Sequence, residues 1–239
     1  MSKGSFVSPD QRSGIRARVE PIALAMSRAG LTPNMLTLIG FGIAAAGGLF
    51  LAAEWWIVGG IVATAGAGFD MFDGAVARAT GQVSKLGAFM DSTFDRWGEG
   101  VVYLGIIIGT GQAGFDLGTW LAGAALVSAF MVSYTRAKSE SMGFSSGTGM
   151  AAIGFAPREV RTVILAIALV GAGVAGGVST SLSDLGTLIL TAGLALIAVL
   201  ATITVIQRVL FVTRQNQSSD PNPQPAEPNQ SSEGAETER

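Results

Sequence analysis

Two acidic stretches interrupt the apolar part of this chain: FDMFDGAVAR at residues 69–78 and GAFMDSTFDR at residues 87–96. The first follows WIVGGIVATAGAG, residues 56–68, a run apolar enough to cross a lipid bilayer. A charged side chain at membrane depth costs a few kcal/mol. Four aspartates in neighbouring apolar helices therefore require cations to hold them, and their arrangement determines how the rest of the chain is interpreted.

The composition is that of a polytopic membrane protein. Hydrophobic residues make up 49% of the 239 residues, charged residues only 13%, and the mean hydropathy is +0.49. About a quarter of the residues of a soluble domain are charged. The chain contains no cysteine and no histidine, which excludes disulfides, the usual zinc ligands and the usual general base. Its chemistry must use carboxylates, hydroxyls, Lys, Arg and hard metal ions.

Six apolar runs have the length of a membrane span: residues 33–53, 56–79, 85–111, 117–138, 159–178 and 185–213. A basic, amphipathic stretch at residues 10–29 precedes them and is typical of a helix lying on the membrane surface. We therefore predict an all-α integral membrane protein with six transmembrane helices after an amphipathic juxtamembrane helix. Residues 1–32 form the N-terminal segment, 33–213 the catalytic membrane domain, and 214–239 a polar, Pro-rich, disordered tail.

The distribution of Lys and Arg predicts the orientation in the membrane. The N-terminal segment, the second and fourth connections between spans, and the end of the sixth span carry these cations, whereas the turns at 53–56, 111–117 and 177–185 carry none. Both termini and the aspartate-bearing turn are therefore expected on the cytoplasmic side of the plasma membrane. Trp55, Trp56 and Trp120 are expected at the opposite interface.

The four aspartates are expected to face one another. Asp70 and Asp73 share one face of the second span, and Asp91 and Asp95 continue a ridge from Gly87 on the third. The short turn between the spans makes them antiparallel neighbours. Carboxylates without His or Cys select hard cations, so this cluster predicts a site for Mg²⁺ or Mn²⁺.

Small residues accompany the acids. Gly74 and Ala77 leave a notch beside them, and Gly87 leaves one opposite. Such residues are common where membrane helices pack closely, and they also make room for a phosphorylated ligand. The spacing alone does not decide between the two.

The spacing Asp-x-x-Asp-Gly-x-x-Ala-Arg, then Gly-x-x-x-Asp-x-x-x-Asp, resembles the complete motif of the CDP-alcohol phosphotransferases. The resemblance implies transfer from a CDP-linked lipid with two Mg²⁺ ions, Mn²⁺ being an alternative, and a homodimer. The metal ligands implied are Asp70, Asp73, Asp91 and Asp95, with Asp95 also the base; CDP-lipid contacts implied are Gly74, Ala77, Arg78, Gly87 and, from the TPN-type element, Thr32, Pro33, Asn34 and Thr37. A carboxylate base agrees with the absence of histidine.

The link between the fourth and fifth spans indicates the acceptor. Its cations Arg136, Lys138, Arg158 and Arg161 form a candidate pocket for a phosphate monoester, although any of them can serve only as a positive-inside charge. SYTRAKSE and PREVR resemble stretches of prokaryotic phosphatidylinositol-phosphate synthases, with Lys138 where Arg is common. The hypothesis is that CDP-diacylglycerol reacts with inositol 1-phosphate.

Three alternatives stay open at this point. Glycerol 3-phosphate is the acceptor of a related synthase, and the lipid can be an archaeol instead of a diacylglycerol. A divalent-cation transporter is the alternative from another class, but it would place carboxylates near the midplane and polar residues on several spans. The expected partners are these substrates, membrane lipid and a second copy of the chain, not nucleic acid.

Overall fold

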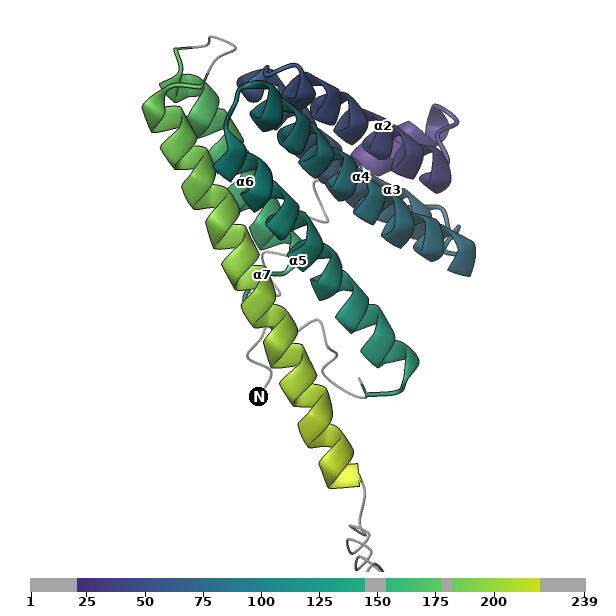
Figure 1. Cartoon of the computed structure of the whole chain (residues 1–239). Coiled ribbons are helices and arrows are strands. Elements are labelled where there is room, and N and C mark those ends of the chain that lie inside the picture. The colour runs from purple at the N-terminus through teal and green to yellow at the C-terminus, as the bar shows by residue number, and fades with distance from the viewer. Residues whose placement is uncertain (1–20, 145–153, 178–181, 220–239) are drawn as a thin grey trace, which may run out of the picture.

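The computed structural model describes residues 21–144, 154–177 and 182–219, and the regular secondary structure of these ranges is helical (Figure 1). The helices are α2 (Pro33–Ala52), α3 (Trp56–Ala79), α4 (Lys85–Gln112), α5 (Asp116–Ser141), α6 (Arg158–Ala175) and α7 (Asp184–Ser219). Residues 21–28 form one more helical segment before them. Each predicted apolar run coincides with one helix, which confirms the all-helical prediction.

Hydroxyl side chains fix the starts of α2 and α4. Thr32 Oγ1 accepts a hydrogen bond from the Met35 N–H at 3.3 Å, and Pro33 occupies the first turn. Ser84 Oγ accepts from the Gly87 N–H at 3.0 Å. Both are N-caps, which satisfy backbone donors that the helix leaves without partners. The TPN element and the first motif glycine of α4 therefore lie at helix starts, where their positions are well defined.

Glycines let α2 pack closely against α3. A Cβ added at Gly47 would lie 2.5 Å from the backbone nitrogen of Ala63, and one at Gly66 would lie 2.6 Å from that of Ala44. No side chain fits at such distances, so these glycines serve close helix approach. Helix α2 also packs against α4, α5 packs against α7, and α6 against both α3 and α7 (Figure 1). The tight α2–α3–α4 group places the two acidic stretches side by side.

Three helices are long and apolar enough to cross a membrane by composition: Pro33–Ala52, Asp116–Ser141 and Asp184–Gln217. The other three contain charged residues, namely the motif aspartates on α3 and α4 and the arginines at the start of α6. Trp55 and Trp120 are exposed, as an interfacial belt requires, but Trp56 is buried in the core. The Trp56 ring packs inside the bundle against Gly109 of α4 and so does not face outward as the rings of Trp55 and Trp120 do.

The ends of the chain differ from the predicted boundaries. Helix α7 continues to Ser219, so residues 214–219, which we assigned to the disordered tail, are helical. Nothing in this polar stretch breaks a helix before Pro221. Ala23 is buried with Leu36 and Val76, so the segment at 21–28 packs on the start of α2 and the end of α3. The remainder of the predicted surface helix and the tail from 220 on lie outside the described residues.

Candidate active site

Asp73 is the most enclosed of the described motif aspartates. It is only 5% exposed, and Thr37 of α2 donates its hydroxyl hydrogen to Asp73 Oδ2 at 2.6 Å. Such a short hydrogen bond to a carboxylate is charge-assisted and holds the carboxylate in one orientation. The start of α2 therefore contributes to the site by positioning a motif aspartate.

The aspartates of α4 lie beside Asp73. Asp73 is close enough to Asp91 and Asp95, and Asp91 to Asp95, for their negative charges to repel one another. Asp95 is partly neutralised by two arginines: Arg96 Nη1 lies 3.2 Å from Oδ2 and Arg158 Nη1 lies 2.8 Å from Oδ1. Arg158 comes from α6, so the fifth predicted span reaches the proposed base.

The donor set fits a hard divalent cation. Among the described side chains, no three carboxylates form a metal-holding group by themselves. Asp70 lies one helical turn before Asp73 on α3, and its side chain is outside the described residues. With Asp70 included, Asp73, Asp91 and Asp95 offer only carboxylate oxygens, the ligands that Mg²⁺ and Mn²⁺ prefer. Their mutual repulsion is the property that a cation would relieve.

Gly74 and Gly87 are unlike the glycines that pack helices together. Among the described residues, a Cβ added at Gly74 would meet only the guanidinium of its own helix neighbour Arg78, with Nη1 at 3.1 Å. One added at Gly87 would meet Ser84 Oγ at 3.1 Å and Asn34 Oδ1 at 3.5 Å. No neighbouring backbone approaches either glycine. Close approach of helix backbones therefore does not account for these two glycines, which lie beside the side chains of Arg78 and Asn34.

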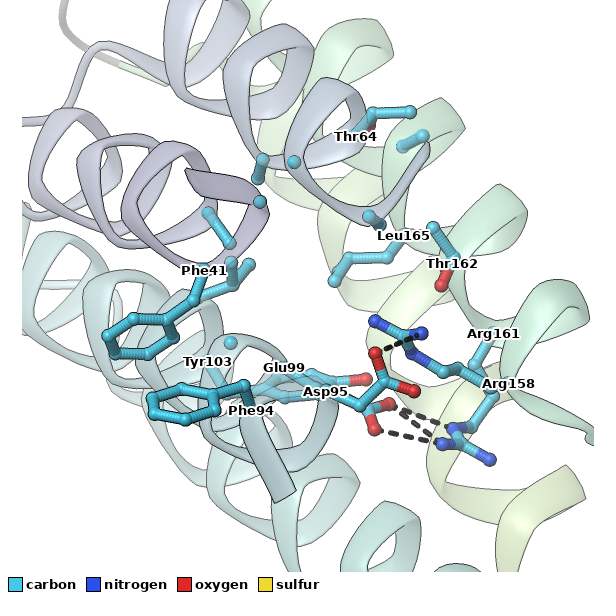
Figure 2. A pocket seen from close by; sticks show the side chains of 18 of the residues that line it. Phe41, Thr64, Phe94, Asp95, Glu99, Tyr103, Arg158, Arg161, Thr162 and Leu165 are labelled. Carbon is cyan, nitrogen blue, oxygen red and sulfur yellow. Dashed lines mark hydrogen bonds and ion pairs between the residues drawn. The ribbon is translucent and has the colours of Figure 1, made fainter. Parts of the chain in front are cut away.

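A cavity opens beside Asp95 among α2, α3, α4 and α6 (Figure 2). Its volume is about 620 Å³, including the space that opens to the outside. The polar side chains in its wall are Thr37, Thr64, Asp95, Glu99, Tyr103, Arg158, Arg161 and Thr162, and the remaining wall is made of small and apolar residues. The cavity thus joins the aspartate cluster to the start of α6 and continues into the apolar interior.

Glu99 and Arg161 form a second ion pair next to the first. Arg161 Nη2 lies 2.9 Å from both carboxylate oxygens of Glu99, and Nε donates to Oε1 at 3.0 Å. Figure 2 shows the two arginines of α6 each facing a carboxylate of α4. Sequence reasoning missed Glu99, although its position four residues after Asp95 extends the acidic ridge and could have indicated it.

The predicted acceptor cations do not all come together. Arg158 and Arg161 lie in the cavity wall. Arg136, on α5, is exposed and pairs with Glu140 at 2.9 Å between Nε and Oε1; Lys138 is also exposed. A further cation was missed: Arg208 of α7 is buried and donates to the Val132 carbonyl. The positive charge of Arg208 interacts with those of Arg136 and Arg161, so these three arginines lie in one basic region. An arginine within an apolar helix is unusual, and this could have indicated Arg208 from the sequence.

Both the sequence and the fold of this chain match known proteins. Residues 30–204 match the model of the CDP-alcohol phosphatidyltransferase family. The chain belongs to this family. The membership decides against the divalent-cation transporter and agrees with the resemblance carried by the motif.

Its relatives include synthases of inositol phosphate lipids. An archaetidylinositol phosphate synthase of Pyrococcus horikoshii is 37% identical over 198 residues, 83% of this chain and 92% of the relative. The crystal structure of Mycobacterium tuberculosis phosphatidylinositol phosphate synthase with CDP-DAG bound matches with a TM-score of 0.68 and 31% identity, covering 81% of this chain and 92% of that one. The same enzyme with manganese and citrate matches with a TM-score of 0.70 and 30% identity, covering 88% and 96%.

Proposed function

We propose that this phosphatidyltransferase transfers the phosphatidyl group of CDP-diacylglycerol to inositol 1-phosphate, forming phosphatidylinositol phosphate and CMP. The observation that carries the proposal is the contact between Arg158 of α6 and Asp95 at 2.8 Å. It places a cation suited to a phosphate monoester against the carboxylate suited to deprotonate the acceptor's hydroxyl. The named activities of the Pyrococcus and Mycobacterium relatives both involve an inositol phosphate.

The proposed reaction is one displacement at phosphorus. The acceptor hydroxyl gives its proton to Asp95 as its oxygen bonds to the lipid-linked phosphorus, and the bond from that phosphorus to the oxygen of CMP breaks. Asp70, Asp73, Asp91 and Asp95 would hold the divalent ions, which when bound neutralise the diphosphate and the departing CMP. Thr37 keeps Asp73 oriented, and Arg78 beside Gly74 contacts the diphosphate. Gly74 and Gly87 leave room for the cytidine, bordered by Thr32, Pro33 and Asn34, and Ala77 keeps the adjoining helix surface small.

Arg158 has two roles in this proposal. Its guanidinium contacts Asp95, and its side chain is 24% exposed, so a dianionic phosphate can compete for it. When the acceptor's phosphate takes the guanidinium, Asp95 loses a neutralising charge and becomes the stronger base. The buried Arg208, whose charge interacts with those of Arg136 and Arg161, supplies further positive potential, and Arg161 lies in the same wall as Arg158. The exposed Lys138 remains a predicted contact of the phosphate. A free polyol offers no comparable charge.

Two related activities are tested by the same experiment. Purified protein with Mg²⁺ and CDP-diacylglycerol should release CMP rapidly with inositol 1-phosphate and slowly with free inositol. Faster CMP release with glycerol 3-phosphate would show that glycerol 3-phosphate, and not inositol 1-phosphate, is the acceptor, while the phosphatidyl transfer itself would stand. Repeating the screen with CDP-archaeol tests which lipid the enzyme uses as donor. An archaeol lipid is the second candidate because the Pyrococcus relative is an archaetidylinositol phosphate synthase.

We also propose the membrane placement that the cation distribution predicts. All six helices α2–α7 cross the plasma membrane, with both termini and the aspartate site on the cytoplasmic side and the protein acting as a homodimer. The three helices of less apolar composition then have their charges directed into the bundle. Cysteine labelling from either side, at Ala113 for the outer turn and at Gly81 for the inner turn, distinguishes this orientation from its inverse.

A further inference from the structure

The ion pair of Glu99 and Arg161 is the most enclosed ionic contact among the described residues. The Arg161 side chain is 1% exposed and that of Glu99 is 10% exposed. Each guanidinium nitrogen of Arg161 donates a hydrogen bond: Nε and Nη2 to Glu99, and Nη1 to the carbonyl of Ala156 at 2.9 Å. Although Arg161 lies in the cavity wall, each of its guanidinium nitrogens thus has an acceptor within the protein.

The same arginine joins three parts of the chain. Glu99 belongs to α4, and Ala156 belongs to the segment just before α6. The backbone N–H groups of Phe155 and Ala156 in turn donate to Thr204 Oγ1 of α7, both at 3.1 Å. The first turn of α6 is therefore attached to α4 and α7 by hydrogen bonds that converge within a few residues of Arg158.

The two ion pairs form successive cross-links between the same helices. Asp95 and Glu99 are four residues apart on α4, and Arg158 and Arg161 are three apart on α6, so each pair of side chains shares a helical face. Breaking one partner of a buried pair leaves an uncompensated charge that its surroundings must move to accommodate. A shift of α6 at Arg161 would displace Arg158 as well.

We infer that Glu99 and Arg161 are positioning residues for the acceptor site: their buried pair holds the start of α6 so that Arg158 faces Asp95. This inference rests on the proposed function and deepens it. It assigns direct contact with the acceptor's phosphate to Arg158 and an indirect role to Arg161, whose donors are engaged by Glu99 and Ala156. Because Glu99 is negatively charged like the substrate's phosphate, it does not bind that phosphate and acts by keeping Arg161 in position.

Whether the acceptor KM rises or falls in Glu99→Gln tests the inference. If Arg161 bound the phosphate itself, Glu99→Gln would release Arg161 and remove a repelling charge, so the acceptor KM would fall. If the pair positions Arg158, Glu99→Gln should raise the acceptor KM about 10-fold or more and lower kcat, while the KM for the CDP-lipid changes less than about 3-fold. Glu159→Gln is the matched control, because it removes the same charge from an exposed position on α6 and should change neither constant.

Glu99→Asp provides the second variant, should Glu99→Gln fail to fold. It keeps the charge but withdraws the carboxylate by one methylene, and it should restore most of kcat with an acceptor KM between those of wild type and Glu99→Gln. An unchanged or lowered acceptor KM in the folded variants would overturn the inference. Failure of the wild type to use inositol 1-phosphate would instead overturn the proposed function, and the variants would then be compared with the phosphorylated acceptor that the screen identifies.

Discussion

Replacing Thr37 by valine should weaken the binding of the divalent cation and leave the fold intact. Valine has the shape of threonine without the hydroxyl that donates to Asp73 Oδ2 at 2.6 Å. Hydrogen bonds to charged groups contribute about 1.5–3 kcal/mol. Residues that orient a metal ligand typically change metal affinity by about 10–100-fold when altered, a range that agrees with this energy.

The assay is CMP release as a function of Mg²⁺ at saturating CDP-lipid and acceptor. The half-saturating Mg²⁺ concentration should rise by about one to two decades, and kcat at saturating Mg²⁺ should stay within a few fold of wild type. Thr64→Val is the matched control, because Thr64 faces the same cavity but donates to the carbonyl of Gly60. It should leave the Mg²⁺ dependence unchanged.

Two results would refute this reasoning. An unchanged Mg²⁺ dependence in Thr37→Val would show that the hydrogen bond does not orient a metal ligand. A raised KM for the CDP-lipid with normal Mg²⁺ dependence would show that Thr37 acts on the nucleotide, the role that the sequence resemblance implied.

Four further outcomes are expected. Exhaustive EDTA treatment should abolish CMP release, and added Mg²⁺ or Mn²⁺ should restore it, because the aspartates cannot neutralise the diphosphate without a bound cation. Full activity without a metal would contradict the metal site. Asp95→Asn should lower kcat by about 10²–10⁴-fold, and a variant with intact turnover but weak CDP-lipid binding would identify Asp95 as a ligand only. Arg158→Ala should raise the acceptor KM by roughly one to two decades, measured against a nearly constant CDP-lipid KM; equal use of inositol and inositol 1-phosphate by the wild type would argue against this contact. Gly66→Ala should destabilise the protein by about 1–3 kcal/mol, seen as a lower Tm in detergent, because the new Cβ would lie 2.6 Å from Ala44; Gly68→Ala, with open space around it, should not.

Much of this protein follows from short-range sequence patterns. The apolar runs determined six helices because backbone hydrogen bonds must be satisfied within each segment in lipid. Residues at spacings of three and four share a helical face, so the ridge from Gly87 through Asp91 to Asp95 could be predicted from spacing alone. Thr32 and Pro33 marked the start of α2 because capping depends on neighbouring residues.

The contacts between helices needed the tertiary structure. Thr37 and Asp73 are 36 residues apart, and Arg161 and Glu99 are 62 apart; no local pattern specifies which face of α2 or α6 meets which face of α3 or α4. The same limit applies to Gly66 and Gly74, which look alike in the sequence. Gly66 abuts the backbone of Ala44, whereas Gly74 faces only the side chain of Arg78, because helix packing encloses one of them and leaves the other beside the site.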